Sequence, residues 1–210
     1  PLKLKLTNWD ELFGAGHLEP CAAPVHPHHP ELGERLFKLT PEIWIEREDF
    51  EEVPPKGFRR LTPPRIDATG AQLAGNKARL KYGYIIECTG CEKDEAGQLT
   101  AVLAKIIPDT KSGTPGADSI KVKGVLTWVS VAEGICAEVR LYDRLFTEEQ
   151  PDAGGRNFLE ALNPNSRRVI TARLEPGLAQ AEPDQRFQFE RHGYFVADRK
   201  DSTPGKPVFN

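Results

Sequence analysis

The stretch Lys3-Leu4-Lys5-Leu6-Thr7 alternates between polar and apolar side chains, and Glu42-Ile43-Trp44-Ile45-Glu46 repeats this strand-like pattern. Because successive side chains of a β-strand point to opposite faces of a sheet, such alternation is typical of strands with one buried face. Further strands are predicted where segments rich in Val, Ile, Tyr and Phe are separated by turns that contain Gly or Pro. These segments are residues 79–88, 100–107, 120–131, 138–146, 168–174 and 186–196.

Helical signals are few along the chain. Residues 157–162 are predicted to form a short helix, and residues 47–53 one or two helical turns. Residues 93–98 lie between two predicted strands and are typical of a hairpin turn. Residues 12–40 and 61–75 are predicted as loops, the second being interpreted as an insertion. Many short strands with few helices predict an all-β sandwich or barrel.

The composition is that of a soluble globular chain. Its 210 residues are 39% hydrophobic and 28% charged, which suits one or two domains. No apolar run reaches the roughly 18 residues that a membrane helix needs, so no membrane partner is expected. The four cysteines are unevenly spaced, which argues against a disulfide framework and predicts a cytoplasmic location. The sequence starts at Pro1 and contains no Met, so we expect it to be part of a larger protein.

Positive charge is concentrated in residues 56–81. The whole chain carries −3, which disfavours a general nucleic-acid binder, but this window carries +6 and the rest carries −9. Clustered cations suit contacts with nucleic-acid phosphates, and a solvated charged loop is the alternative interpretation. The cations of the window are Lys56, Arg59, Arg60, Arg65, Lys77, Arg79 and Lys81.

Sequence patterns for catalysis are missing. No segment matches the Gly-rich phosphate-binding loop, and Gly14-Ala15-Gly16 lacks the third glycine of a dinucleotide fingerprint. No serine lies in a nucleophile-elbow pattern. The carboxylate pairs at residues 48–49, 51–52 and 148–149 are interpreted as solvated surface groups. We therefore predict no catalytic residue in this chain.

A zinc site is the strongest competing interpretation. Cys88-Thr89-Gly90-Cys91 has the spacing that lets two thiolates bind one metal, and the histidines at 26, 28 and 29 are possible further ligands. Read with His29-Pro30-Glu31, the cysteines imitate the signature of zinc deaminases. However, Glu87 rather than proline precedes the cysteine pair, and the pair lies in a strand-like segment near a turn. We predict no metal here and keep the zinc enzyme as an alternative.

Six segments, taken in order, resemble the anticodon-binding region of glutaminyl-tRNA synthetases, which are class I aminoacyl-tRNA synthetases. Together they extend over nearly the whole chain, and six ordered motifs are more specific than any one of them. The segments are His26-Pro27-His28-His29-Pro30-Glu31-Leu32-Gly33, Trp44-Ile45-Glu46-Arg47-Glu48-Asp49-Phe50, Lys121-Val122-Lys123-Gly124-Val125-Leu126-Thr127-Trp128-Val129-Ser130, Ala137-Glu138-Val139-Arg140-Leu141-Tyr142-Asp143-Arg144-Leu145-Phe146, Phe187-Gln188-Phe189-Glu190-Arg191-His192-Gly193-Tyr194-Phe195 and Ser202-Thr203-Pro204-Gly205-Lys206-Pro207-Val208-Phe209-Asn210.

The resemblance implies an all-β fold of two β-barrels, of the ribosomal-protein-like anticodon-binding type. A distal barrel of residues 53–134 would be inserted into a proximal barrel that is made from both ends of the chain. Residues 1–52 would supply the first part of the proximal barrel, and residues 135–210 the second part.

The resemblance also implies which residues contact the anticodon. By motif, Arg59 and Arg60 fall where the family contacts the last base, Arg79 where it contacts the first, and Gln188 and Arg191 where it reads the middle uracil. RNA readers use such side chains on splayed single-stranded bases, and the Gln188 amide offers the donor and acceptor that suit a uracil edge. Because a spacing of three puts residues on opposite faces of a regular strand, a bulge or turn near Arg191 is needed if both side chains touch one base. For each arginine, a surface ion pair is the alternative.

Three features depart from the family pattern. Residues 61–77 form a longer connection than is usual between the two arginine-bearing strands, that of Arg60 and that of Arg79. Thr127 stands where the family commonly has His, and the Cys-x-x-Cys motif is not a family feature.

The resemblance implies a non-catalytic part of an enzyme that ligates glutamine to tRNA(Gln) with ATP. The expected partners are tRNA(Gln) and the enzyme's own N-terminal catalytic domain. No cofactor is expected in this fragment, because ATP with magnesium would bind in the catalytic domain. Two alternatives are the corresponding region of a glutamyl-tRNA synthetase and a free-standing RNA-binding β-barrel protein.

Overall fold

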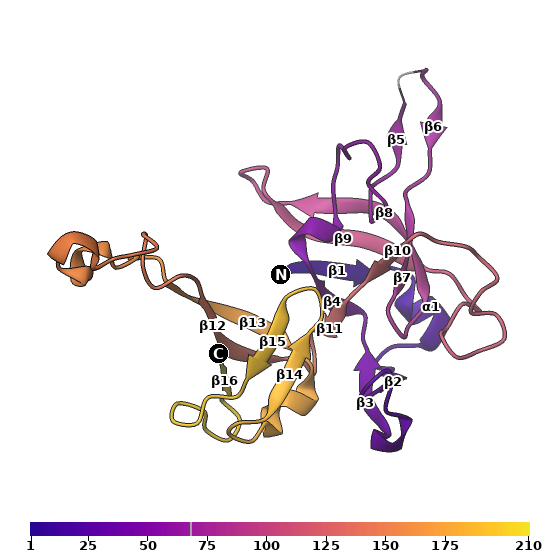
Figure 1. Ribbon diagram of the computed structural model, residues 1–210. Helices are drawn as coiled ribbons and strands as arrows, with labels where there is room; N and C mark the ends of the chain where they lie inside the picture. The colour runs from indigo at the N-terminus through magenta and orange to yellow at the C-terminus, as the bar shows by residue number, and fades with distance from the viewer. Residues whose placement is uncertain (68) are drawn as a thin grey trace. The chain divides into compact units, whose positions relative to one another are not determined.

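The computed structural model describes residues 1–67 and 69–210, which form two compact units, Pro1–Gly134 and Ile135–Asn210 (Figure 1). Strands provide most of the regular structure, so the predicted all-β class is confirmed. Within the described ranges, α1 (Trp9–Phe13) is the single α-helix. No helix in these ranges has the length and apolar character needed to cross a membrane.

The first unit is organised by a seven-stranded sheet in the order β10-β7-β8-β9-β1-β4-β11. Its edge strands, β10 and β11, are separated in the chain by Thr127 alone, so the sheet curls until its edges approach each other. The result is a nearly closed, barrel-like sheet. The bounds are β1 (Leu2–Leu6), β4 (Glu42–Ile45), β7 (Lys77–Leu80), β8 (Ile85–Lys93), β9 (Leu99–Ile106), β10 (Gly124–Leu126) and β11 (Trp128–Ser130).

Alternation along β1 places its three leucines in the core of this sheet. Leu2, Leu4 and Leu6 are at most 4% exposed, and β1 lies between β4 and β9. Burial of a leucine side chain contributes about 1.5–3 kcal/mol to folding. The two lysines between them face the other way and form ion pairs, Lys3 with Glu42 of the adjacent strand β4 and Lys5 with Glu92 of β8, one strand further away. The strand prediction for residues 3–7 is therefore confirmed.

Three predicted strands are interrupted in the structure. One of them, residues 186–196, forms the two strands β14 (Arg186–Phe189) and β15 (Gly193–Val196). Residues 79–88 contain the end of β7 and the start of β8, because a tight turn at Tyr82, with φ of 61°, separates the two strands. Residues 120–131 contain both β10 and β11, which lie at opposite edges of the sheet order. Apolar content alone did not reveal these three breaks.

The predicted turn between β8 and β9 is confirmed. The backbone N–H of Asp94 donates to the Gln98 carbonyl at 2.9 Å, and the Gln98 N–H donates to Asp94 Oδ1 at 2.8 Å. These two hydrogen bonds close the hairpin.

The prediction of a loop for residues 12–40 is wrong in part. The segment contains a hairpin of β2 (Glu19–Pro24) and β3 (Glu34–Leu39), with the turn of 3₁₀-helix η1 (Pro30–Leu32) between them. Prolines within β2 concealed the strand, but a two-stranded hairpin has free edges where proline is tolerated.

The predicted insertion at residues 61–75 also contains a short hairpin. Its strands are β5 (Arg65–Ile66) and β6 (Gln72–Leu73), which pair antiparallel. Ala68, within the predicted insertion, lies outside the described residues. Residues 47–53, predicted to be helical, form one 3₁₀ turn, η2 (Arg47–Asp49).

The second unit combines a three-stranded sheet, in the order β13-β12-β16, with a hairpin of β14 and β15. Its core is aromatic and aliphatic: Phe195 and Phe209 are buried together with Val139 and Leu174. The bounds are β12 (Ile135–Tyr142), β13 (Arg167–Leu174), η5 (Pro176–Gln180), β14 (Arg186–Phe189), β15 (Gly193–Val196) and β16 (Val208–Phe209).

An arm of residues 143–166 leads away from β12 and returns to β13 (Figure 1). It contains two 3₁₀ turns, η3 (Ala153–Gly155) and η4 (Phe158–Ala161). The predicted helix at 157–162 is thus a 3₁₀ turn, and Asn157 caps it by accepting a hydrogen bond from the Leu159 N–H at 3.2 Å.

The sheet of the first unit combines strands from two predicted domains. β1 and β4 come from residues 1–52, whereas β7 to β11 come from residues 53–134. The proposed sharing of a proximal barrel by residues 1–52 and 135–210 concerns the arrangement of the two units, and it stays a prediction.

Candidate nucleic-acid interface

Arg60 is anchored by an ion pair with a buried carboxylate. Its Nε lies 2.7 Å from Oδ1 of Asp49, whose side chain has no exposed surface, while the Arg60 side chain is 38% exposed. The backbone N–H of Leu61 donates to the Asp49 carbonyl at 3.0 Å, which fixes the segment after Arg60 against η2. The position of this guanidinium is therefore set by the fold.

Arg59 lies close to β7 and β10 through its backbone. A Cβ at Gly124 of β10 would come within 2.4 Å of the Arg59 carbonyl oxygen and within 3.3 Å of the Ala78 Cβ in β7. Only glycine leaves room for this approach. The Arg59 side chain itself is exposed. The structure thus brings Arg59 and Arg60 beside the strand that carries Arg79.

Arg79 has a structural role in the first unit. Its Nη1 donates to the Thr110 carbonyl at 3.0 Å and to Ser112 Oγ at 3.3 Å, and its Nη2 donates to the Ala117 carbonyl. These bonds hold the loop that follows β9 onto β7. The contact of Arg79 with the first anticodon base stays a prediction. In such a contact, the Arg79 guanidinium would bind the base while it also donates hydrogen bonds to this loop.

Gln188 and Arg191 lie on the hairpin of β14 and β15. Gln188 is exposed in β14, where it pairs with Tyr194 of β15. Arg191 lies in the turn between the two strands, with φ of 69° in the left-handed region. A bulge or turn near Arg191 is needed if both side chains touch one base, and the structure contains a turn there. Both side chains therefore belong to one hairpin.

A cluster of phenylalanines supports this hairpin from its other face. Phe189 and Phe195 stack with ring centroids 4.6 Å apart. Phe209 of β16 makes edge contacts with Phe187 and Phe189 at 5.8 and 5.2 Å. Aromatic pairs of this kind add about 0.5–1.5 kcal/mol beyond the area they bury. The face that carries Gln188 is therefore held on a packed base.

The cationic window of residues 56–81 is partly neutralised by the fold. Lys77 Nζ lies 3.3 Å from a Glu87 carboxylate oxygen, and Arg60 is paired with Asp49. Lys81 Nζ lies 5.3 Å from the centre of the Tyr82 ring. The window is consequently less positive than its sequence indicates.

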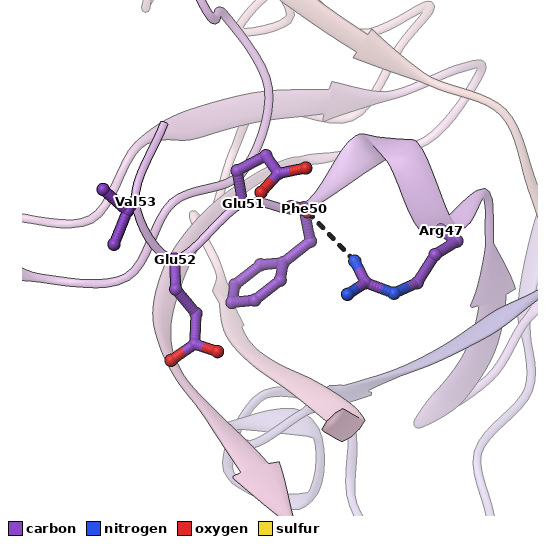
Figure 2. A pocket seen from close by; sticks show the side chains of 5 residues that line it. All are labelled: Arg47, Phe50, Glu51, Glu52 and Val53. Atoms are coloured by element: carbon purple, nitrogen blue, oxygen red, sulfur yellow. Dashed lines mark hydrogen bonds between the residues drawn. The ribbon is translucent and has the colours of Figure 1, made fainter. Parts of the chain in front are cut away.

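A small pocket lies beside η2, next to the anchor of Arg60. Figure 2 shows the lining side chains, which are those of Arg47, Phe50, Glu51, Glu52 and Val53. The volume of the pocket is about 240 Å³. Arg47 Nη1 donates to the Phe50 carbonyl at 3.3 Å, which is the dashed line in Figure 2. Two glutamates and a single arginine form an acidic lining. A phosphate group would be repelled here, so we assign the pocket no part in nucleic-acid contacts.

The cysteine pair lies on a bulge of β8. The register of β8 shifts between Cys88 and Gly90, and Cys88 Sγ lies 3.6 Å from the Gly90 carbonyl oxygen. Burial raises the pKa of the Cys88 thiol to about 11 and also raises the pKa of Cys91. In the part of the chain that the structure describes, no three His, Cys, Asp or Glu side chains are arranged to hold a metal ion.

Two models of known protein families match this chain, one in its first part and one in its second part. A family model described as "tRNA synthetases class I (E and Q), anti-codon binding domain" matches residues 1–107, and a second model with this description matches residues 125–198. The chain belongs to this family. The first matched range contains Arg59, Arg60 and Arg79, and the second contains Gln188 and Arg191.

Curated relatives match this chain over all of its 210 residues. Proteins named Glutamine–tRNA ligase from Cupriavidus taiwanensis and Ralstonia nicotianae are each 65% identical to it. A Glutamine–tRNA ligase from Bordetella avium is 54% identical. The chain covers 33%, 34% and 33% of these three relatives, so it spans about a third of their length.

Sequence reasoning missed three partners of the predicted site residues. It did not find Asp49 beneath Arg60, the loop carbonyls that hold Arg79, or Tyr194 opposite Gln188. The alternation in Phe187-Gln188-Phe189 and Tyr194-Phe195 was a signal for the last of these, because it places both polar groups on one face of a hairpin. The other two depend on long-range packing.

Proposed function

We propose that this chain is the anticodon-binding region of a glutamine–tRNA ligase. The observation that carries the proposal is the match of the whole chain to proteins named Glutamine–tRNA ligase at 65% identity. Family models with an anticodon-binding description support the assignment in both parts of the chain. Relatives with this name favour glutamine over glutamate as the amino acid.

Within this function, the two units contact different anticodon bases. Arg59 and Arg60 contact the last base and Arg79 contacts the first, while Gln188 and Arg191 read the middle uracil. The exposed Gln188 amide on a packed hairpin supports the assignment of Gln188 to the middle uracil, because a fixed donor and acceptor suit the edge of an unstacked uracil. The anchoring of Arg60 by Asp49 supports the assignment of Arg60 to the last base, because a pre-positioned guanidinium loses little conformational freedom on binding.

The whole protein ligates glutamine to tRNA(Gln) with ATP and magnesium. ATP and magnesium bind in a catalytic domain that lies outside this chain. The tRNA and this catalytic domain are the two partners of the chain. The reaction takes place in the cytoplasm. The chain itself contributes affinity and selectivity for the tRNA rather than chemistry.

Charging assays with the full-length protein test this function. The protein should attach glutamine, and not glutamate, to tRNA(Gln), and transplanting the anticodon of another tRNA into tRNA(Gln) should reduce kcat/KM strongly. Efficient charging with glutamate would refute the amino-acid assignment. Charging that is insensitive to the anticodon would refute the role of this chain.

A further inference from the structure

Tyr194 is an exposed aromatic residue on a strand whose other face is packed. Its side chain is 82% exposed in β15, while its neighbour Phe195 is 9% exposed and stacks on Phe189. The ring of Tyr194 therefore contributes little to the core. Tyrosine is enriched in binding surfaces, because its ring is apolar on its faces and carries a polar hydroxyl at one end.

The neighbours of Tyr194 on this face are polar. Gln188 is its direct cross-strand partner, and side chains in such pairs have Cβ atoms about 4.5–5.5 Å apart on the same face. Arg186, two residues before Gln188, shares this face and is also exposed. One face of the hairpin thus presents an aromatic ring, an amide and a guanidinium side by side.

This combination matches the chemistry of an unstacked nucleotide. A π face stacks on the base, an amide offers a donor and an acceptor to the base edge, and a guanidinium suits the adjacent phosphate. A protein partner would use the ring differently, by inserting it into an apolar pocket. Because the ring stands next to an amide and a cation rather than in an apolar patch, the surface favours RNA.

We propose that Tyr194 is the stacking platform for the anticodon base whose edge Gln188 contacts. This inference rests on the proposed function, and it adds a residue that fixes the plane of the base. Gln188 reads the edge of a base effectively only when the base is held in one plane. Tyr194 supplies that plane, and the phenylalanine cluster beneath the hairpin keeps it rigid.

The test measures binding of tRNA(Gln) to the full-length protein carrying Tyr194→Leu or Tyr194→Phe. Two tRNAs are compared: the unmodified tRNA and one with an abasic nucleotide at the middle anticodon position, which keeps its sugar and phosphate. Tyr194→Leu should weaken binding of the unmodified tRNA by roughly 5- to 150-fold, the range for one stacked base, and should barely change binding of the abasic tRNA. Tyr194→Phe keeps the ring and should restore most of the affinity.

Tyr142→Leu is the matched control, because Tyr142 is also exposed in the second unit, at 59%, but belongs to β12 and not to the hairpin, and its hydroxyl donates to Asn210 Oδ1 at 3.1 Å. It should bind both tRNAs normally. An equal loss on both tRNAs with Tyr194→Leu would mean that the residue supports the hairpin, and no loss would mean that it binds nothing. A loss with Tyr194→Phe as large as with Tyr194→Leu would assign the effect to the hydroxyl. Each of these results overturns the stacking proposal.

Gln188→Ala, measured alongside, separates this proposal from the proposed function. If Gln188→Ala weakens binding and Tyr194→Leu does not, only the stacking role fails. If both variants and an exchanged anticodon leave binding unchanged, the anticodon-binding function itself fails, and the stacking proposal falls with it.

Discussion

Arg60 Nε lies 2.7 Å from Oδ1 of Asp49, a carboxylate with no exposed side-chain surface. A buried charge is tolerated when it is paired, so removal of either partner leaves an uncompensated group. The same arginine is a proposed anticodon-binding residue. Weaker tRNA binding by an Arg60 variant would therefore have two causes. The guanidinium would no longer contact the base, and the structure around Asp49 would be locally less stable.

We predict that Arg60→Ala lowers the local stability around η2 by about 1–2 kcal/mol, since a charge-assisted bond is removed at a partly exposed site. Hydrogen–deuterium exchange of residues 49–61 measures this directly, because the Leu61 amide is bonded to the Asp49 carbonyl. Arg59→Ala is the matched control and should leave exchange unchanged. Unchanged protection in Arg60→Ala would show that the ion pair is dispensable.

Lysines of the cationic window are predicted to contact tRNA phosphates. Substituting Lys56, Lys77 and Lys81 by Ala should flatten the plot of log affinity against log salt concentration by roughly 0.7 for each phosphate that is no longer neutralised. The pairing of Lys77 with Glu87 makes its share the smallest. The control is a triple substitution of exposed lysines outside the window, Lys38, Lys93 and Lys105. If both triple variants show the slope of the unsubstituted protein, the RNA binds another face.

Acid is predicted to destabilise the first unit through Glu19. Burial alone would raise the pKa of this carboxyl, but bonds from Lys111, His17 and Tyr84, at 2.6, 2.8 and 2.9 Å, hold it below its ordinary value. A lowered folded-state pKa means that the unfolded chain takes up its proton first, so stability falls as the pH drops below about 4.5.

Thermal unfolding between pH about 6 and about 3 tests the role of Glu19. Glu19→Gln should melt at a lower temperature near neutral pH and should lose less further stability on acidification than the unsubstituted protein. Glu95→Gln, an exposed glutamate in the turn between β8 and β9, is the control. Parallel melting curves for all three proteins would rule out a contribution from Glu19.

The cysteine pair is predicted to bind no metal. Cys88→Ser with Cys91→Ser should leave the protein folded, at a cost of about 1–3 kcal/mol for the hydroxyl placed at the buried Cys88 position. Elemental analysis of protein purified without added metal is the measurement. Stoichiometric zinc that disappears in the double variant would contradict the prediction and revive the deaminase-like alternative.

The parts of the fold that follow local patterns were predictable from sequence. The leucines of β1 alternate with lysines, and burial of one face follows directly from the strand period of two. The turn at Tyr82 was missed, because a tyrosine with positive φ is uncommon, although the adjacent Gly83 is a turn signal. The hairpin of β2 and β3 was hidden by prolines that a two-stranded ribbon tolerates.

The candidate site shows the same division. Gln188 and Arg191 are three residues apart, so a bulge or turn near Arg191 is needed if both contact one base, as the family resemblance implies, and the structure contains a turn there. The partners of Arg79 lie 31 to 38 residues further along the chain, where no local pattern indicates them. Long-range packing, rather than local propensity, decides how many hydrogen-bond donors of each arginine remain available to contact RNA.

In the proposed function, the hairpin of β14 and β15 reads the middle anticodon base. This role is tested most directly by kcat/KM for charging of tRNA(Gln) by full-length proteins carrying Gln188→Ala or Arg191→Ala. Each variant should lose about 1–3 kcal/mol of transition-state stabilisation on tRNA(Gln), as expected when a residue that reads a base is removed, and much less on a tRNA already changed at the middle anticodon base. Equal losses on the two tRNAs would contradict the account, because they would mean that these residues are structural or contact only phosphate.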